Sequence, residues 1–229
     1  MFYMDSTMLV ILPGLLLSIL ASYWVRSAYS KYAKVATRAG ITAAEMAERM
    51  LRQNGAGDVR IERVRGELTD HYDPKDRVLR LSDGVYGSTS VAALGIAAHE
   101  CGHAMQHHEE YAPLALRSAI VPAVSVTSNM AMPLFFIGLI LAWEPLLWVG
   151  IAFFLAAVVF SLITLPVEFN ASGRALRMLQ ADGYLTDEEN AGAKRVLNAA
   201  AMTYVASALM ALLQLARMLL LANNRGRRR

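Results

Sequence analysis

The stretch Ile96–Glu110, "IAAHECGHAMQHHEE", contains four of the five histidines in the chain. His99 and His103 lie four residues apart, so on a helix their imidazole rings project from one face about one turn apart. This spacing lets both rings reach one zinc ion at roughly 2.0–2.1 Å. Glu100 lies beside them and is placed to take a proton from a metal-bound water, whose acidity zinc raises. The stretch therefore predicts a helix that carries a zinc site.

Apolar segments on both sides of this stretch predict membrane helices. The chain has 229 residues and is 55% hydrophobic, which exceeds the usual share in a soluble globular domain. Three runs contain no charged residue, and each approaches the ~20 residues that a helix needs to cross the hydrocarbon layer. These runs are Met8–Val25, Pro122–Trp143 and Pro145–Val167. A fourth run, Ala199–Ala222, is long enough but contains Gln214 and Arg217.

The distribution of basic residues predicts the orientation of the chain in a membrane. Asp5 precedes the first apolar run, and four basic residues follow it between Arg26 and Arg38. This asymmetry favours an uncleaved anchor, with the segment that follows it in the cytoplasm. The tail "RGRRR" (Arg225–Arg229) predicts contact with anionic lipid on the cytoplasmic face. That location conflicts with a full fourth crossing, so the last apolar run is expected either to span the membrane or to lie along its surface.

Residues 26–121 predict a small region of helices and strands. Tyr29–Asn54 is expected to be helical, and "TAAE" (Thr42–Glu45) within it forms a capping box. "VRIERVRG" and "DRVLRLS" (Val59–Gly66 and Asp76–Ser82) alternate apolar and charged residues, as half-buried strands do. "DHYDPKD" is the expected turn between them. Ser88–His108 is expected to form the helix that carries the zinc motif.

The third ligand of the predicted zinc site must come from elsewhere in the chain. A catalytic zinc site has three protein ligands and leaves one position for water. His107 continues the histidine series, but a third ligand from the same straight helix cannot easily complete a tetrahedron. Glu168 is a better candidate, because an acid that directly follows a membrane span costs free energy unless it has a task. The alternative interpretation of Glu168 is a charge that complements a helix dipole.

The predicted topology is consistent with a site shared by distant segments. His103 and Glu168 can bind one ion only if an even number of membrane crossings separates them, and the sequence predicts two. Cys101 lies inside the motif but faces the apolar stripe of the helix. We therefore expect it to be a core residue rather than a ligand.

Together these residues resemble a known family, the neutral zinc metallopeptidases of bacterial membranes of the YugP type. The resemblance covers most of the chain. It includes the N-terminal anchor, "HYDPKDRVLRLSDGVY" (His71–Tyr86), "SVAALGIAAHECGHAMQH" (Ser90–His107), the apolar hairpin and "PVEFNASGRA" (Pro166–Ala175). More distantly, the chain is similar to the membrane gluzincins of the HtpX and CAAX-prenyl-protease kind. The implied fold is a mainly α integral membrane protein: a gluzincin-like zinc protease core with a small β-sheet and an HExxH helix, plus about four membrane helices.

The resemblance also implies the division of the chain. Residues 1–25 are the expected N-terminal anchor, and residues 26–121 are the first part of a zinc metalloprotease domain, with the HExxH helix at residues 88–108. Residues 122–167 form a transmembrane hairpin. Residues 166–198 supply the second part of the catalytic domain with the glutamate ligand, and residues 199–229 form a membrane or interfacial helix with a basic tail.

The activity implied by the resemblance is hydrolysis of peptide bonds at the membrane face. One Zn²⁺ ion held by His99, His103 and Glu168 polarises the scissile carbonyl. Glu100 activates the water and passes the proton to the leaving amine. The expected substrate is a polypeptide, above all a membrane protein. Because zinc peptidases bind their substrates as extended strands, Asp76–Ser82 is our candidate edge strand for substrate addition; the alternative is an ordinary strand of the sheet.

Other polar residues are candidates for supporting roles. In the wider gluzincin group, an acid four residues after the glutamate ligand hydrogen-bonds a zinc-bound histidine. Ser172 occupies that position here, and its hydroxyl can accept an imidazole N–H bond without adding negative charge. Asn170 is an alternative orienting group. The transition-state oxyanion usually needs a further donor, and the sequence does not choose between Arg174, Tyr184 and Tyr204.

The expected location is the plasma (inner) membrane of a bacterial cell, with the active site on the cytoplasmic side. The lipid bilayer is therefore an expected partner, and an accessory membrane protein or a second copy of the chain stays open. Basic residues do not form a stripe interleaved with aromatics, so nucleic acid is not expected. The alternative function is a non-catalytic membrane scaffold, whose structural zinc would need a fourth ligand from His107 or Glu109. Glu100 favours the enzyme, because a structural site does not need it.

Overall fold

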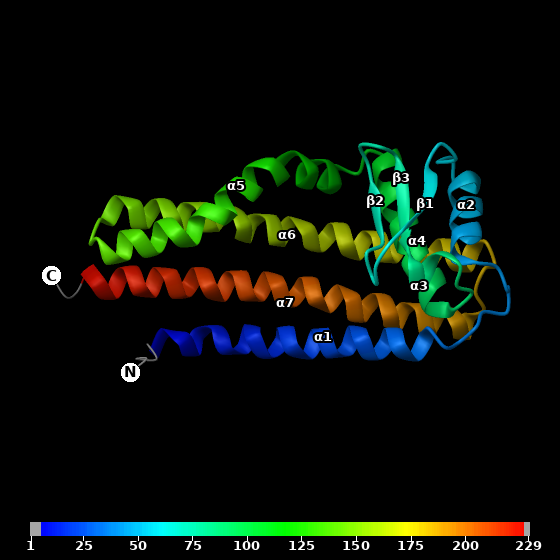
Figure 1. The fold of residues 1–229 in the computed structure, drawn as a ribbon, viewed down its shortest axis with the longest axis horizontal. Coiled ribbons are helices and arrows are strands. Elements are labelled where there is room, and N and C mark those ends of the chain that lie inside the picture. The colour runs from blue at the N-terminus through cyan, green and yellow to red at the C-terminus, as the bar shows by residue number, and fades with distance from the viewer. Residues whose placement is uncertain (1–5, 227–229) are drawn as a thin grey trace. The chain divides into compact units, whose positions relative to one another are not determined.

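The computed structural model describes residues 6–226, which divide into two compact units (Figure 1). We call the first the apolar unit; it consists of the chain up to Ser22, Leu116–Leu165 and the chain from Thr203 onward. The second, the site unit, consists of Tyr23–Ala115 and Pro166–Met202. Asp5 and the last three arginines of the basic tail lie outside the described residues. The predicted orientation of the chain in a membrane rests partly on these residues.

The apolar unit is made of parts of four long helices. A 3-10 turn, Ser6–Ile11, leads into α1 (Leu12–Tyr32); the others are α5 (Ala112–Ile140), α6 (Glu144–Ala181) and α7 (Asp187–Gly226). Within the described residues, all four are long and apolar enough to cross a membrane. This confirms the expectation of about four such helices, including the last, for which the sequence was least decisive.

Helix α6 is longer than the sequence suggests. The apolar run that ends at Val167 and the amphipathic segment that follows form one continuous helix, with Pro166 inside it. A proline in a helix interior removes one hydrogen bond, but long apolar helices tolerate it where neighbouring groups satisfy the freed carbonyl. Glu168 therefore extends from the same helix as the apolar run that precedes it.

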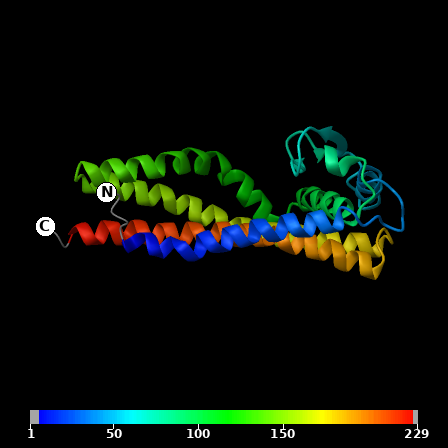
Figure 2. The ribbon, with the colours of Figure 1, turned by 60° about the horizontal axis from the view of Figure 1, so that its bottom comes forward.

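Glycines allow close helix packing inside the apolar unit. Helices α5 and α6 form a hairpin and lie side by side near the turn that joins them (Figures 1 and 2). A Cβ atom at Gly138 would lie 2.5 Å from the backbone nitrogen of Leu147, and one at Gly150 would lie 2.6 Å from that of Phe135. Close backbone approach by small residues is the usual way in which membrane helices pack, because lipid provides no hydrophobic force between them.

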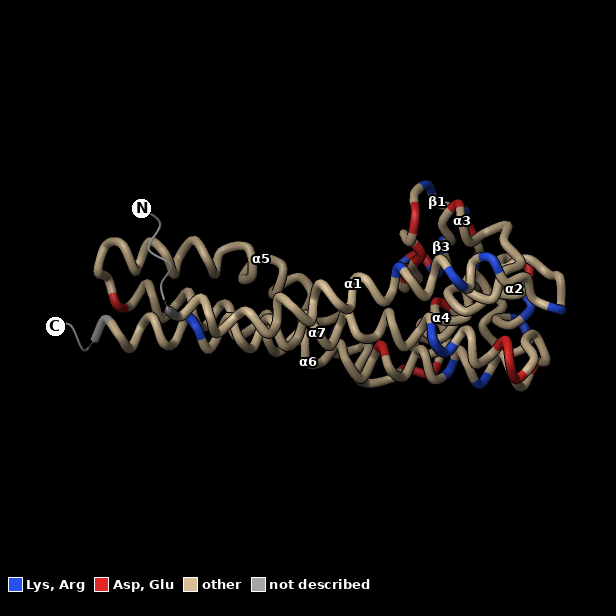
Figure 3. The backbone as a smooth tube through the Cα atoms, turned by 90° about the horizontal axis from the view of Figure 1, so that it is seen from below, with Lys and Arg blue, Asp and Glu red and all other residues tan. Residues whose placement is uncertain are grey.

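Besides parts of α1, α6 and α7, the site unit contains the remaining helices and the sheet. They are α2 (Ala43–Gln53), β1 (Arg60–Val64), β2 (His71–Asp73), β3 (Val78–Ser82), α3 (Asp83–Tyr86) and α4 (Val91–His108). The capping box between Thr42 and Glu45 starts α2, and the Ser90 hydroxyl accepts a hydrogen bond from Ala93 N at the start of α4. Charged residues are concentrated on the elements of this unit (Figure 3).

The predicted helix Tyr29–Asn54 is wrong in its continuity. Helix α1 ends at Tyr32 and α2 begins at Ala43. The intervening segment is irregular and pairs with the start of α4 through a bridge between Ala36 and Ser90. Gly40 has a φ of +63°, a left-handed conformation that glycine adopts readily and that interrupts a right-handed helix.

The sheet corrects two further expectations. Its strand order is β1-β3-β2, with β3 parallel to β1 and antiparallel to β2. Strand β3 is therefore the central strand, so the expectation that Asp76–Ser82 forms a free edge is wrong. The predicted turn also contains a strand, β2, which carries the chain across the sheet so that β1 and β3 can pair in parallel. Val78, Leu79 and Leu81 are fully buried, as a central strand requires.

Candidate metal centre

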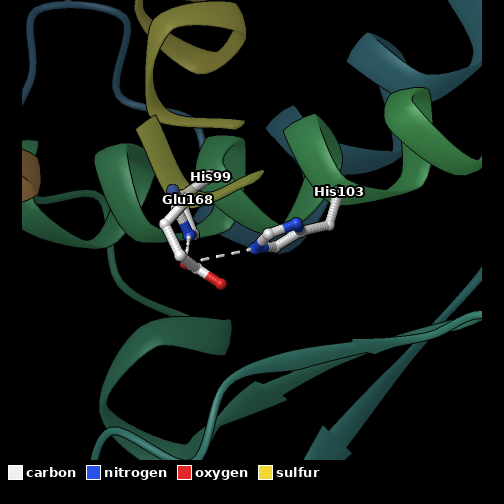
Figure 4. Close-up of side chains that lie close together, drawn as sticks. All are labelled: His99, His103 and Glu168. Atoms are coloured by element: carbon white, nitrogen blue, oxygen red, sulfur yellow. Dashed lines mark ion pairs between the residues drawn. The ribbon is translucent and has the colours of Figure 1, made fainter. Parts of the chain in front are cut away.

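Three side chains from two separate helices meet at the candidate metal centre (Figure 4). Helix α4 carries His99 and His103, and α6 carries Glu168. Glu168 Oε2 lies 3.3 Å from His99 Nε2 and 3.6 Å from His103 Nε2. One ligand atom from each of the three residues lies within 4.8 Å of the other two. Among the described residues, this is the only such group of three or more histidine, cysteine or acidic side chains.

This arrangement fits a zinc ion. Two ligand atoms bound to one zinc at about 2.0–2.1 Å and at a tetrahedral angle lie roughly 3.3–3.5 Å apart. Both Glu168–histidine distances are close to this range. Two imidazole nitrogens and one carboxylate oxygen are also a usual donor set for catalytic zinc. Three ligands leave the fourth tetrahedral position for water or substrate.

Helix geometry and one glycine bring the three candidate ligands together. Because His99 and His103 are four residues apart on α4, their ring centroids lie 4.8 Å apart. Gly102 faces α6 so closely that a Cβ atom there would lie 2.5 Å from the carbonyl oxygen of Ala171. Any larger residue at this position would separate the two helices. The sequence analysis missed this role of Gly102, although a glycine inside a helix indicates a packing or functional reason.

Glu100 directly follows the candidate ligand His99 and is largely buried, with 8% of its surface exposed. Burial lowers the pKa of His103, whereas the hydrogen bond to Glu168 and the negative charge of Glu100 raise it, and the net direction is upward. Glu100 lies in α4 between His99 and His103, so it is beside two of the three clustered side chains in the chain. The nearby acids therefore stabilise the protonated imidazole of His103 relative to the neutral one.

Each histidine uses its second ring nitrogen for a hydrogen bond. His99 Nδ1 lies 3.1 Å from the hydroxyl oxygen of Ser172, one of the two orienting candidates from the sequence. His103 Nδ1 lies 3.0 Å from Gln106 Oε1. These bonds leave the Nε2 atom of both rings facing Glu168. Such partners hold metal-binding imidazoles in orientation.

Gln106 is a site residue that the sequence reasoning missed. It is fully buried, and its amide nitrogen donates hydrogen bonds to the carbonyl oxygen of Val167 and to Asn170 Oδ1. Asn170, the other orienting candidate, thus contacts Gln106. The available signal was its position: a polar residue three places after His103 lies on the same side of the helix.

The three candidates for an oxyanion donor have different surroundings. Arg174 is held by Asn170 Oδ1 and Glu109 Oε2, each at 2.7 Å, and its guanidinium lies over the ring of Tyr111. The Tyr184 hydroxyl donates to Gln53 Oε1 at 2.9 Å. Both groups are therefore engaged elsewhere. Tyr204 belongs to the apolar unit, so its assignment stays a prediction.

The remaining candidates of the motif are used in other contacts. His107 Nδ1 lies 2.9 Å from the Tyr72 hydroxyl, and Glu109 pairs with Arg174. Cys101 is fully buried in the core around α2 and α4. Burial raises the pKa of its thiol well above the usual range, so the thiol stays protonated. These surroundings agree with a core role for Cys101.

Comparisons with known proteins show a match over nearly the whole chain. The sequence profile of a family described as "Putative neutral zinc metallopeptidase" matches residues 7–223. The chain is also 49% identical over 208 residues to the "Putative membrane protease YugP" of Bacillus subtilis (strain 168), an alignment that covers 91% of this chain and 92% of that protein. No solved structure shows a significant match.

Proposed function

Because the chain belongs to the family of neutral zinc metallopeptidases, we propose that it is an endopeptidase that cleaves membrane or membrane-associated proteins. The observation that carries this proposal is the cluster of His99, His103 and Glu168, whose spacing suits one zinc ion with an open position. Glu100, beside this cluster, supplies the acid–base group that hydrolysis needs and that a purely structural site would not use.

In the proposed mechanism, each residue has a separate task. His99, His103 and Glu168 hold the ion, and Ser172 and Gln106 orient the two imidazoles. When bound, zinc polarises the scissile carbonyl and increases the acidity of a water molecule. Glu100 takes the proton from that water as it attacks the carbonyl carbon. The same carboxyl group then gives the proton to the nitrogen of the leaving amine.

Three features support the proposed substrate class and location. Four helices are suited to a membrane, and Glu168 directly follows the apolar run of α6. The relative is named as a membrane protease. We propose that residues 26–121 and 166–198 form the catalytic part on the cytoplasmic side of the bacterial plasma membrane, joined by the hairpin of residues 122–167. An accessory membrane protein or a second copy of the chain would be compatible with this arrangement.

The contacts of two residues weigh against the alternative of a non-catalytic scaffold with a closed zinc site. Such a site needs a fourth protein ligand. The sequence offers His107 and Glu109, but His107 bonds Tyr72 and Glu109 pairs with Arg174. Neither belongs to the group of ligand atoms around Glu168.

Substitution of Glu100 tests the proposed function. In the full chain purified in detergent, Glu100→Gln should keep zinc but reduce hydrolysis about 10²–10⁴-fold, the usual contribution of a general base. Cells that contain this variant in place of the wild-type chain should accumulate uncleaved membrane proteins, which quantitative proteomics can identify. Glu188→Gln, the same change at an exposed position, is the control and should be fully active. Normal cleavage of such a substrate by Glu100→Gln would contradict the mechanism.

A further inference from the structure

We propose that Gln106 is a positioning residue that holds two metal ligands in register with each other. Its side-chain oxygen orients the ring of His103, and its side-chain nitrogen binds the main chain just before Glu168. This inference rests on the proposed function, because it concerns the same zinc site. It assigns one side chain the task of joining the two chain segments that supply the ligands.

The direction of the Gln106 amide follows from a chain of donors and acceptors that begins at Arg174. A guanidinium group only donates hydrogen bonds, and Arg174 Nε lies 2.7 Å from Asn170 Oδ1. The atom at that position of Asn170 must therefore be the oxygen. Because this oxygen and the carbonyl oxygen of Val167 are both acceptors, Gln106 must present its NH₂ group to them, at 3.0 and 2.8 Å.

The orientation of this amide determines the tautomer of His103. With the nitrogen of Gln106 directed at α6, its oxygen lies 3.0 Å from His103 Nδ1. An amide oxygen can only accept, so Nδ1 must carry the hydrogen. When the ring is neutral, Nε2 then has the free lone pair that metal binding requires. The relay from Arg174 through Asn170 and Gln106 thus selects the form of His103 that can bind zinc through the nitrogen facing Glu168.

His99 has no hydrogen-bond partner that fixes its tautomer in this way. Its partner, the Ser172 hydroxyl, can either donate or accept a hydrogen bond, so this contact is compatible with both tautomers of the ring. It also connects His99 to only one atom of α6. Gln106 makes three hydrogen bonds from a fully buried position, where no solvent can replace a lost partner. The two histidines are therefore held in different ways, and we expect His103 to depend more on its partner.

The second contact of Gln106 controls the position of the carboxylate ligand. Val167, whose carbonyl oxygen accepts from Gln106, directly precedes Glu168 in the chain. Any sliding of α6 along α4 would lengthen this bond and move the Glu168 carboxylate away from both imidazoles. The close approach at Gly102 sets the distance between the two helices, and Gln106 sets their register.

The test uses the full chain in detergent and measures zinc binding rather than activity alone. Gln106→Met keeps the length of the side chain and removes its hydrogen bonds. We expect zinc affinity, measured by competition with a chromophoric chelator, to fall about 10–100-fold, the usual effect of losing a partner of a zinc ligand. We also expect the visible absorption of the cobalt(II)-substituted protein to change. Gln180→Met makes the same change at an exposed position of α6 and should leave both measurements unchanged.

Two outcomes would overturn the inference. If Gln106→Met folds and binds zinc with wild-type affinity and an unchanged cobalt spectrum, Gln106 is not a positioning residue, even if the variant melts at a lower temperature. If Gln106→Met does not fold, Asn170→Ala decides: it keeps Gln106 but removes an acceptor of its amide. Wild-type affinity and spectrum in Asn170→Ala would then reject the relay, and a severalfold loss would support it.

These results are separable from those that test the proposed function. Failure of the wild-type chain to bind zinc would reject both proposals. If zinc binds normally to Gln106→Met while Glu100→Gln still abolishes hydrolysis, only the positioning role is rejected.

Discussion

Polar side chains form different kinds of hydrogen bonds in the two units. In the apolar unit, most hydroxyl groups bond carbonyl oxygens of their own helix one turn earlier: Ser18 to Gly14, Thr127 to Ala123, Ser161 to Ala157 and Thr164 to Phe160. Two contacts in this unit, from Arg217 to Thr7 and from Gln214 to Met132, join distant segments. In the site unit, polar side chains connect elements that are far apart in sequence. Examples are His99 with Ser172, Gln106 with Val167 and Tyr184 with Gln53.

The exposure of apolar side chains also differs between the two units. Ile19 and Leu16 in α1 are 58% and 61% exposed, whereas Leu79 and Leu94 in the site unit are fully buried. A helix in lipid satisfies its polar groups internally and exposes its apolar ones. A domain in water buries its apolar groups, and its buried polar groups must find partners. The comparison shows why a site built from long-range polar contacts occurs in the site unit.

The largest expected difference concerns two buried polar residues one turn apart on α6, Thr164 and Glu168. Glu168→Ala should lower zinc affinity by more than about a hundredfold. Loss of a ligand should weaken zinc binding more than loss of a hydrogen-bond partner of a ligand does. Hydrolysis should be lost with the metal. Thr164→Ala should bind zinc normally, because its hydroxyl bonds only its own helix in the contacts that we identify. Zinc content after dialysis measures both effects. A zinc-loaded Glu168→Ala variant with normal affinity would remove Glu168 from the ligand set.

A smaller difference is expected for apolar side chains. Leu79→Ala in β3 should destabilise the folded protein by about 2–5 kcal/mol, the usual result of a large-to-small change in a packed core. Ile19→Ala in α1 should change stability by less than about 0.5 kcal/mol. Lipid or detergent surrounds this side chain in the folded protein and also in the unfolded one. Denaturation of both variants in the same detergent provides the comparison. Equal losses would show that the exposed face of α1 is covered in the folded protein.

The smallest expected effect concerns Cys101, which should not react with alkylating reagents in the native protein. The thiol is fully buried, and burial raises its pKa. Raising the pH from 7 to 9 should therefore produce almost no thiolate, the form that reacts with alkylating reagents. Mass spectrometry should find Cys101 unmodified in the native protein and fully modified after denaturation. Rapid labelling of the native protein would show that the core around α2 and α4 opens readily.

Much of this molecule was predictable from local patterns. The four-residue spacing of His99 and His103 defines a face of any helix, and apolar runs of sufficient length identify helices suited to a membrane. The prediction that Glu168 joins the histidines needed one more step, the count of membrane crossings, and the structure brings the three side chains together. Their roles as ligands, and that of Glu100 as the base, stay predictions until the variants are measured.

The sequence by itself determined the four long apolar helices and the common face of His99 and His103, because hydropathy and helical periodicity act over a few neighbouring residues. Only the tertiary structure decided that β3 is the central strand, that Gly102 allows α6 to approach α4, and that Gln106 joins His103 to Val167. Strand order and register between helices depend on which distant surfaces pack together. No short window of sequence contains both partners of such a contact.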